Sequence, residues 1–158
     1  MPSRANRPTW DDFFIGQLGA LAARATCDRG RSAAIFVRDN DQLASGYVGS
    51  PPGMPHCDDV GHLWDATQSH CLRTVHAEQN AMLRALRHGI SLRDTTVYCT
   101  MTPCFTCAKL MVGVGVYRVV ALYHYHAAQQ STELFADAGV ILRVMTDAQL
   151  YEPTRRDA

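Results

Sequence analysis

Two short motifs constrain this chain more than any other feature of its sequence: His76-Ala77-Glu78 and Pro103-Cys104-Phe105-Thr106-Cys107. Cys104 and Cys107 are three residues apart, so on a helical turn their thiols share one face. A helix N-terminus favours thiolate over thiol, and two thiolates with one imidazole neutralise Zn²⁺. Three protein ligands leave a fourth position open, which is typical of a catalytic zinc. We therefore predict His76, Cys104 and Cys107 as zinc ligands.

Glu78 follows the predicted imidazole ligand by two residues, at a helix start where both side chains can reach the metal region. A carboxylate there can take a proton from an attacking water and pass it to a leaving amine. Each motif alone occurs in unrelated proteins, and a redox cysteine pair beside a surface histidine is the alternative interpretation. Both together, each opening a predicted helix, are the signature of zinc-dependent nucleobase deaminases. We therefore predict Glu78 as the catalytic residue.

The hydrophobic pattern predicts an α/β fold in which helices and strands alternate. Predicted helices cover 10–25, 77–88, 104–112 and 132–138, and predicted strands cover 33–37, 42–47, 95–100, 117–123 and 140–145. Strands alternating with helices imply parallel pairing with right-handed crossovers, and a hairpin turn joins the first two strands. We expect a three-layer α/β/α architecture with a five-stranded mixed sheet, forming one domain over 1–158.

The charge balance excludes a bulk basic field, because 15 Lys+Arg meet 15 Asp+Glu in 158 residues. We therefore expect no nucleic-acid partner. No apolar run approaches the roughly 20 residues of a membrane span, and the N-terminus has no apolar segment of a secretory signal. We expect a cytoplasmic protein without a membrane partner, whose six cysteines serve metal binding or catalysis rather than disulfides.

Three stretches resemble the cytidine/deoxycytidylate deaminase superfamily, most closely its deoxycytidylate branch. They are GYVGSPPG at 46–53, RTVHAEQNA at 73–81 and TPCFTCAK at 102–109. The resemblance implies a cytidine-deaminase-like fold, a catalytic zinc on His76, Cys104 and Cys107, and proton transfer by Glu78. It also implies the reaction: water adds at C4 of a free cytosine nucleotide, and dCMP becomes dUMP and ammonia.

The resemblance further implies a second, structural zinc near the long loop 48–72. Its candidate ligands are Cys27, Cys57, His62 and Cys71. Four such ligands would form a closed tetrahedral site that holds the loop. His56 and His70 each lie beside a proposed cysteine and could replace His62. The alternative is a set of free buried cysteines and solvated histidines.

The substrate-binding prediction rests on one segment and one aromatic residue. The segment is Tyr47, Val48, Gly49 and Ser50, and the base-facing aromatic is Tyr125, for which core packing is the alternative. The family usually has Asn where Val48 stands, contacting the sugar or phosphate end, and Val cannot make that hydrogen bond. Glycine amides, with Arg29 or Arg31, are candidates for binding a phosphate, but a solvated helix end is the simpler explanation for the two arginines.

The sequence alone leaves two other kinds of function open. One is a deaminase of a different substrate: a 5-modified dCMP, a nucleoside, a guanine-type base or tRNA adenosine, the last disfavoured by the neutral charge. Another is a non-catalytic binding module stabilised by zinc, which Glu78 disfavours because a structural site gains nothing from an unligated carboxylate. The resemblance also implies a homo-oligomer, since family members assemble as dimers, tetramers or hexamers.

Overall fold

A five-stranded sheet forms the centre of the computed structural model, which describes residues 6–150. The strands are β1 (Ala33–Arg38), β2 (Asp41–Tyr47), β3 (Thr96–Met101), β4 (Arg118–His124) and β5 (Ile141–Leu150). Their order is β2-β1-β3-β4-β5. β1 is antiparallel to both neighbours, whereas β3, β4 and β5 run parallel. The predicted five-stranded mixed sheet is therefore confirmed.

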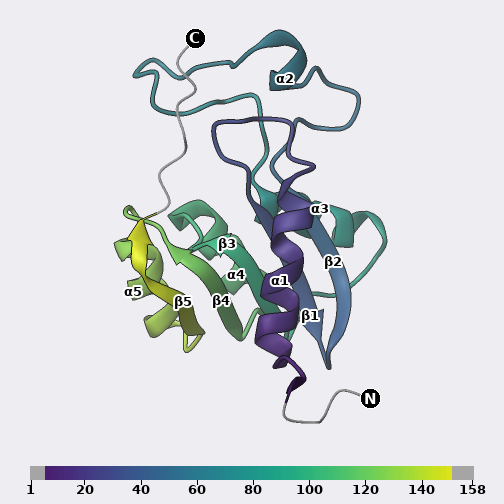
Figure 1. The fold of residues 1–158 in the computed structure, drawn as a ribbon, viewed down its shortest axis with the longest axis vertical. Coiled ribbons are helices and arrows are strands. Elements are labelled where there is room, and N and C mark those ends of the chain that lie inside the picture. The colour runs from purple at the N-terminus through teal and green to yellow at the C-terminus, as the bar shows by residue number, and fades with distance from the viewer. Residues whose placement is uncertain (1–5, 151–158) are drawn as a thin grey trace.

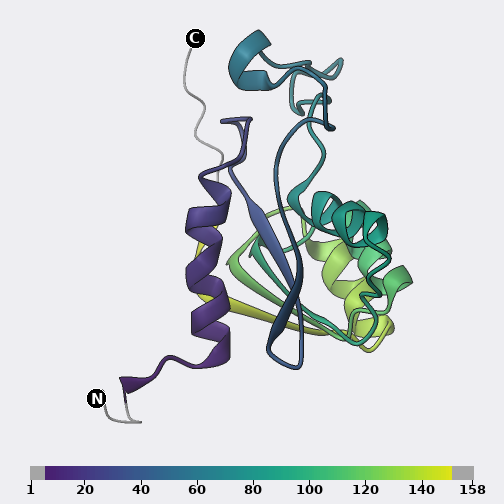
Figure 2. The same ribbon diagram turned by 90° about the vertical axis from the view of Figure 1, so that its right-hand side faces the viewer.

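Helices cover both faces of the sheet (Figures 1 and 2). They are α1 (Trp10–Ala22), α2 (Cys57–Val60), α3 (Ala77–Arg87), α4 (Phe105–Val114) and α5 (Gln129–Asp137). α1 lies on one face, and α3, α4 and α5 lie on the other, which confirms the three-layer architecture. The short α2 lies in the long loop and was not predicted. None of the helices within residues 6–150 combines the length and apolar character that a bilayer crossing needs.

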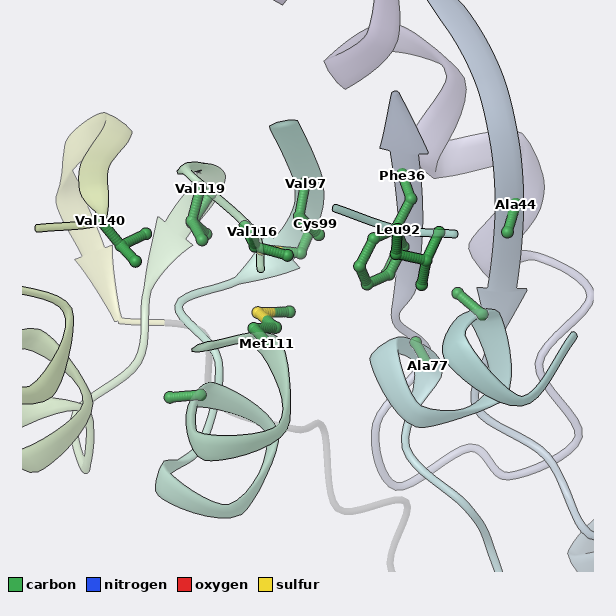
Figure 3. Packing of buried hydrophobic residues seen from close by; sticks show 14 of the residues in the cluster. Phe36, Ala44, Ala77, Leu92, Val97, Cys99, Met111, Val116, Val119 and Val140 are labelled. Atoms are coloured by element: carbon green, nitrogen blue, oxygen red, sulfur yellow. The ribbon is translucent and has the colours of Figure 1, made fainter. Parts of the chain in front are cut away.

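Both faces of the sheet are buried because helices cover both of them. Successive residues of a strand therefore enter opposite buried layers. In β3, Val97 and Cys99 pack against the side chains of α3, α4 and α5, whereas Tyr98 packs against α1. Figure 3 shows the first of these layers, in which Phe36 and Met111 are fully buried. The near-continuous apolar character of β3 and β4 follows from this double burial.

A carboxylate ties α1 to the sheet. Asp11 accepts two hydrogen bonds from Arg118 of β4, at 2.8 and 2.6 Å, and one from Arg143 of β5 at 2.8 Å. The hydroxyl of Tyr98 donates a fourth at 2.8 Å. The paired Arg118 guanidinium lowers the pKa of Asp11 to about 2. The first turn of α1 is thus attached to three strands by one side chain.

Both sequence motifs lie at helix starts on the same side of the sheet. His76 is the N-cap of α3 and Cys104 is the N-cap of α4. β3 ends at Met101, so the turn at Thr102 and Pro103 leads directly into α4. The order of strand, turn and helix therefore places the first predicted zinc ligand of each motif, His76 and Cys104, at a helix start.

Candidate active site

Three donor atoms converge between α3 and α4. The Sγ atoms of Cys104 and Cys107 each lie 3.5 Å from Nδ1 of His76. Tetrahedral zinc, with Zn–S near 2.3 Å and Zn–N near 2.0 Å, requires sulfur and nitrogen atoms about 3.5 Å apart. The donor set and its spacing therefore fit a zinc ion held by three protein ligands. The structure brings together the three residues that the sequence predicts for this role.

The electrostatics of this cluster favour a bound cation. A hydrogen bond from Cys107 lowers the pKa of Cys104 to about 4, and the same bond raises the pKa of Cys107. The neighbouring Cys104 thiolate raises the pKa of His76. A divalent cation at this position would stabilise both sulfurs as thiolates.

Glu78 lies beside the cluster without being one of its three donors. It is the second residue of α3, and its Oε2 lies 3.8 Å from Sγ of Cys107. Burial raises the pKa of Glu78 above its ordinary value. A carboxyl group that holds a proton more readily is suited to carry one between water and a leaving amine.

A cavity of about 730 Å³ opens at this cluster, a size typical of small-molecule sites. Its lining residues come from both helix starts, the ends of the central strands β1 and β3, the segments before β1 and after β4, and the long loop: Cys27, Arg29, Gly30, Ser32, Ala33, Val48, Ser69, His70, Cys71, Thr74, His76, Glu78, Thr100, Met101, Thr102, Cys104, Tyr125 and His126. The cavity is therefore lined both by the His76, Cys104 and Cys107 cluster and by the long loop that carries Cys71.

The predicted substrate residues divide into two groups. Val48 and Tyr125 line the cavity. Among the described residues, Tyr47, Gly49 and Ser50 are not part of that lining. The Tyr47 ring lies 5.9 Å from the Arg84 guanidinium instead. Gly49 pairs with the backbone of the segment before His76, and Ser50 is buried.

A second cluster joins residues from three separate segments. The donor atoms of Cys27, Cys57, His62 and Cys71 all lie within 4.8 Å of one another. Sγ of Cys27 lies 3.5 Å from Nδ1 of His62, and the Sγ atoms of Cys57 and Cys71 lie 3.5 Å apart. These four residues are the predicted set, and they match the four donors of a closed tetrahedral zinc site.

His62 has the orientation that metal-binding histidines require. Its Nδ1 faces the cysteines, and its Nε2 lies 3.2 Å from Oδ1 of Asp28. A carboxylate on the second ring nitrogen fixes the tautomer of a ligating imidazole. His56 and His70, the two alternatives for this position, have other contacts: His56 is the N-cap of α2, and His70 is held by Asp65.

The thiols of this second cluster differ in acidity. Burial raises the pKa of Cys27 and of Cys57. Burial also acts to raise the pKa of Cys71, but the backbone N–H groups of Arg73 and Leu63 outweigh it and lower the value to about 7. Cys71 is therefore the thiol of this cluster that ionises most readily for a metal.

Two polar residues of α3 hold the site in place, a role that the sequence suggests for them beside the alternative of ordinary helix-surface residues. The amide of Asn80 donates to the carbonyl of Tyr47 at 2.9 Å and lies 3.4 Å from those of Gly49 and Val75. The side-chain oxygen of Gln79 accepts from the backbone N–H of His76 at 3.2 Å. Their position just after His76 is the only signal in the sequence, and it does not separate them from ordinary helix-surface residues.

Residues 8–123 match the family described as the cytidine and deoxycytidylate deaminase zinc-binding region. ComE operon protein 2 of Bacillus subtilis is 36% identical over 152 residues, which cover 96% of this chain and 79% of that protein. The deoxycytidylate deaminase of Mycobacterium phage D29 is 33% identical over 125 residues, which cover 73% of this chain and 95% of that protein. The deoxycytidylate deaminase of Saccharomyces cerevisiae is 32% identical, but the match covers only 45% of its length.

A solved structure has the same fold. The dCMP deaminase of cyanophage S-TIM5, in complex with dCMP and dUMP, superposes with a TM-score of 0.76 at 24% identity, covering 88% of this chain and 98% of that chain. The family match spans most of the chain, and the phage relative at 33% identity aligns along 95% of its own length. The chain therefore belongs to the cytidine and deoxycytidylate deaminase family and carries its zinc-binding region.

Proposed function

We propose that this chain hydrolyses the amino group of a free cytosine nucleotide, converting dCMP and water to dUMP and ammonia. The observation that carries the proposal is the position of Glu78, whose carboxylate lies 3.8 Å from Cys107 at the wall of the cavity. A purely structural zinc site has no use for such a carboxylate. Relatives named deoxycytidylate deaminase support the choice of substrate.

In this proposal each residue of the site has a distinct role. His76, Cys104 and Cys107 would hold the zinc, which would supply Lewis-acid chemistry toward the attacking water. Glu78 accepts a proton from the water that adds to C4 and delivers it to the departing amino nitrogen, so its proton balance is restored in each turnover. Val48 and Tyr125 line the cavity and would contact the nucleotide.

The test is ammonia release from the zinc-loaded protein, with dCMP, CMP, deoxycytidine, dCTP and 5-methyl-dCMP as parallel substrates. We expect dCMP to give the highest kcat/KM. Fastest turnover of 5-methyl-dCMP would move the assignment to a modified nucleotide, because Val48 makes this wall less polar than the usual Asn. Absence of ammonia from all five would contradict the proposal.

We also propose a second zinc, held by Cys27, Cys57, His62 and Cys71. The support is the convergence of four donor atoms within 4.8 Å and the Asp28 carboxylate behind His62. Such an ion would join the segment between α1 and β1 to the long loop, which has little apolar core of its own. Metal analysis of the purified protein tests this proposal: about two zinc ions per chain are expected, and one would contradict it.

The proposal extends to the assembly and the compartment of the protein. Large apolar side chains are exposed on the outer helix layer, namely Leu83 and Leu86 of α3 with Leu110 and Val114 of α4. Such a surface is suited to contacts between copies of the chain, and the solution mass would test a homo-oligomer. All six cysteines are free, and thiolate ligands persist in a reducing compartment, which favours the cytoplasm.

A further inference from the structure

One arginine, Arg29, places a permanent positive charge on the wall of the cavity. Among the described residues that line the cavity, Arg29 is the only arginine and there is no lysine. Glu78 is the only acidic residue of the lining, and it belongs to the proposed catalytic cluster. An anionic group that enters this cavity therefore has one fixed cationic partner among the residues that line it, the Arg29 guanidinium.

Contacts from the long loop hold that guanidinium. It lies 5.1 Å from the centre of the Trp64 ring, within the range of a cation–π interaction. One of its nitrogens also donates to the backbone carbonyl of Ser69. These contacts engage one face and one N–H group of the guanidinium, which carries five N–H donors in all. A side chain held in this way loses little conformational entropy when it binds an anion.

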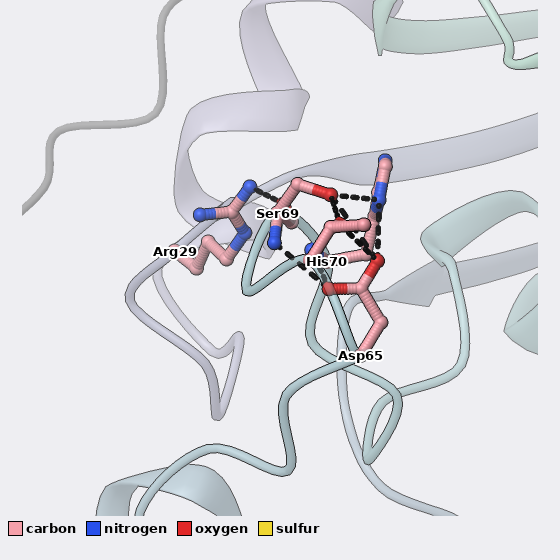
Figure 4. A network of polar contacts seen from close by, with 5 residues as sticks. Arg29, Asp65, Ser69 and His70 are labelled. Atoms are coloured by element: carbon pink, nitrogen blue, oxygen red, sulfur yellow. Dashed lines mark hydrogen bonds and ion pairs between the residues drawn. The ribbon is translucent and has the colours of Figure 1, made fainter.

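Asp65 builds the turn that presents the Ser69 carbonyl. Its Oδ1 accepts from the backbone N–H groups of Ser69 at 2.8 Å and His70 at 3.1 Å. Its Oδ2 accepts from the hydroxyls of Thr67 at 3.0 Å and Ser69 at 3.1 Å, and lies 3.3 Å from Nδ1 of His70. Figure 4 shows this network beside Arg29. The donors around it hold the pKa of Asp65 well below its usual range, with the His70 amide the largest cause.

The second cysteine cluster lies next in sequence to both Arg29 and the turn that holds it. Arg29 follows Cys27 by two residues, and His70 directly precedes Cys71. Cys27 and Cys71 themselves line the cavity. The segment that carries the cation and the turn that holds it are therefore joined at a single cluster of four donors.

We propose that Arg29 binds the phosphate end of the substrate, and that Asp65 is a positioning residue that holds Arg29 through Ser69. The inference rests on the proposed function for the identity of the substrate. Asp65 is not one of the described residues that line the cavity. Its carboxylate points into its own turn, where its oxygens accept hydrogen bonds from Ser69. Discrimination of a nucleotide from a nucleoside then depends on this loop rather than on the catalytic cluster.

The test compares dUMP with deoxyuridine, since the pair differs only in the phosphate and needs no turnover. Isothermal titration gives both dissociation constants for the zinc-loaded protein. We expect the wild type to bind dUMP more tightly. Arg29→Ala should weaken dUMP binding about 10- to 100-fold, the loss of a charge-assisted hydrogen-bond pair, and leave deoxyuridine unchanged within about twofold. Arg29→Lys keeps the charge and should recover part of the affinity.

Asp65→Ala should raise the KM for dCMP about 3- to 10-fold without changing kcat, because it loosens Arg29 but leaves the catalytic cluster intact. Asp65→Asn keeps an acceptor and should recover part of that loss. Arg24→Ala is the matched control, since Arg24 is exposed and is not among the cavity residues. Metal content is measured for every variant. If Arg29→Ala loses metal from the cysteine cluster, Arg29→Gln replaces it because it preserves part of the side-chain stem.

Two results would overturn the inference: equal affinity of the wild type for dUMP and deoxyuridine, or a preference for dUMP that survives both Arg29→Ala and Arg29→Gln. The proposed function fails separately. If no substrate releases ammonia but the dUMP preference depends on Arg29, the anion site stands and the deaminase assignment does not. If deoxycytidine is deaminated but dUMP has no advantage, the reverse holds.

Discussion

Gly46 of β2 lies directly against Ala77 of α3: a Cβ atom at position 46 would be 2.4 Å from the Ala77 carbonyl oxygen. The same atom would lie 2.4 Å from the backbone nitrogen of Ala81. Both neighbours are backbone atoms, so no side-chain rotation relieves the clash. Ala77 follows His76, and this close approach therefore sets where the proposed imidazole ligand lies relative to the sheet.

Gly46→Ala should destabilise the protein and displace the start of α3. Overpacking against other atoms costs about 1–3 kcal/mol, and backbone neighbours place this change at or above the upper end. Urea unfolding measures the loss. Gly16→Ala is the control, because Gly16 lies in α1 with nothing within 4 Å of an added Cβ, and it should stabilise by up to about 1 kcal/mol. Equal stability of the two variants would contradict the packing argument.

Glu78→Gln should keep its metal and lose turnover. The side chain is isosteric but cannot shuttle a proton, so we expect kcat for dCMP to fall by about 10²- to 10⁴-fold. Metal analysis and ammonia release on the same sample separate the two properties. Glu133→Gln, which neutralises an exposed carboxylate on α5, should match the wild type in both. If Glu78→Gln retained full activity, the assignment of the proton carrier would be wrong.

Metal analysis should find about two zinc ions per chain. Cys57→Ala should lower the count to about one and keep the catalytic ion, because Cys57 belongs only to the second cluster. Cys99→Ala provides the control, since Cys99 is buried but lies in neither cluster, and its count should stay near two. A wild-type value near one would remove the second site and leave the first in place.

The contribution of Asp11 to stability should depend on pH in the acid range. Its pKa in the folded protein, about 2, lies below the ordinary 3.8, so the stabilisation is present above the ordinary pKa and is lost as pH falls toward 2. The shift corresponds to about 2 kcal/mol in total, of which roughly half should remain at pH 3.

The measurement compares the free energy of unfolding of the wild type and of Asp11→Asn at pH 6 and pH 3. The difference between the two proteins should be larger at pH 6, because only the wild type carries the titrating carboxylate. A difference that is the same at both pH values, or larger at pH 3, would show that the Arg118 pair does not stabilise the fold in this way.

Much of the fold was predictable because its signals are local. The alternation of helices and strands, the hairpin between β1 and β2 and the two motifs at helix starts all depend on residues close together in the chain. α2 was missed because a helix of this length has no period to detect. α5 begins at Gln129, earlier than predicted, because its first turn lacks a capping side chain to mark it.

The sequence by itself determined which groups are available for the proposed chemistry, because the types and spacing of His76, Glu78, Cys104 and Cys107 already indicate three candidate zinc donors and one carboxylate outside that set. Only the tertiary structure decided which residues meet. In the folded chain His62, rather than His56 or His70, lies against Cys27. Asp65 binds Ser69, which in turn contacts Arg29. These pairs depend on the path of a long loop, whose conformation follows from long-range contacts rather than from any local period.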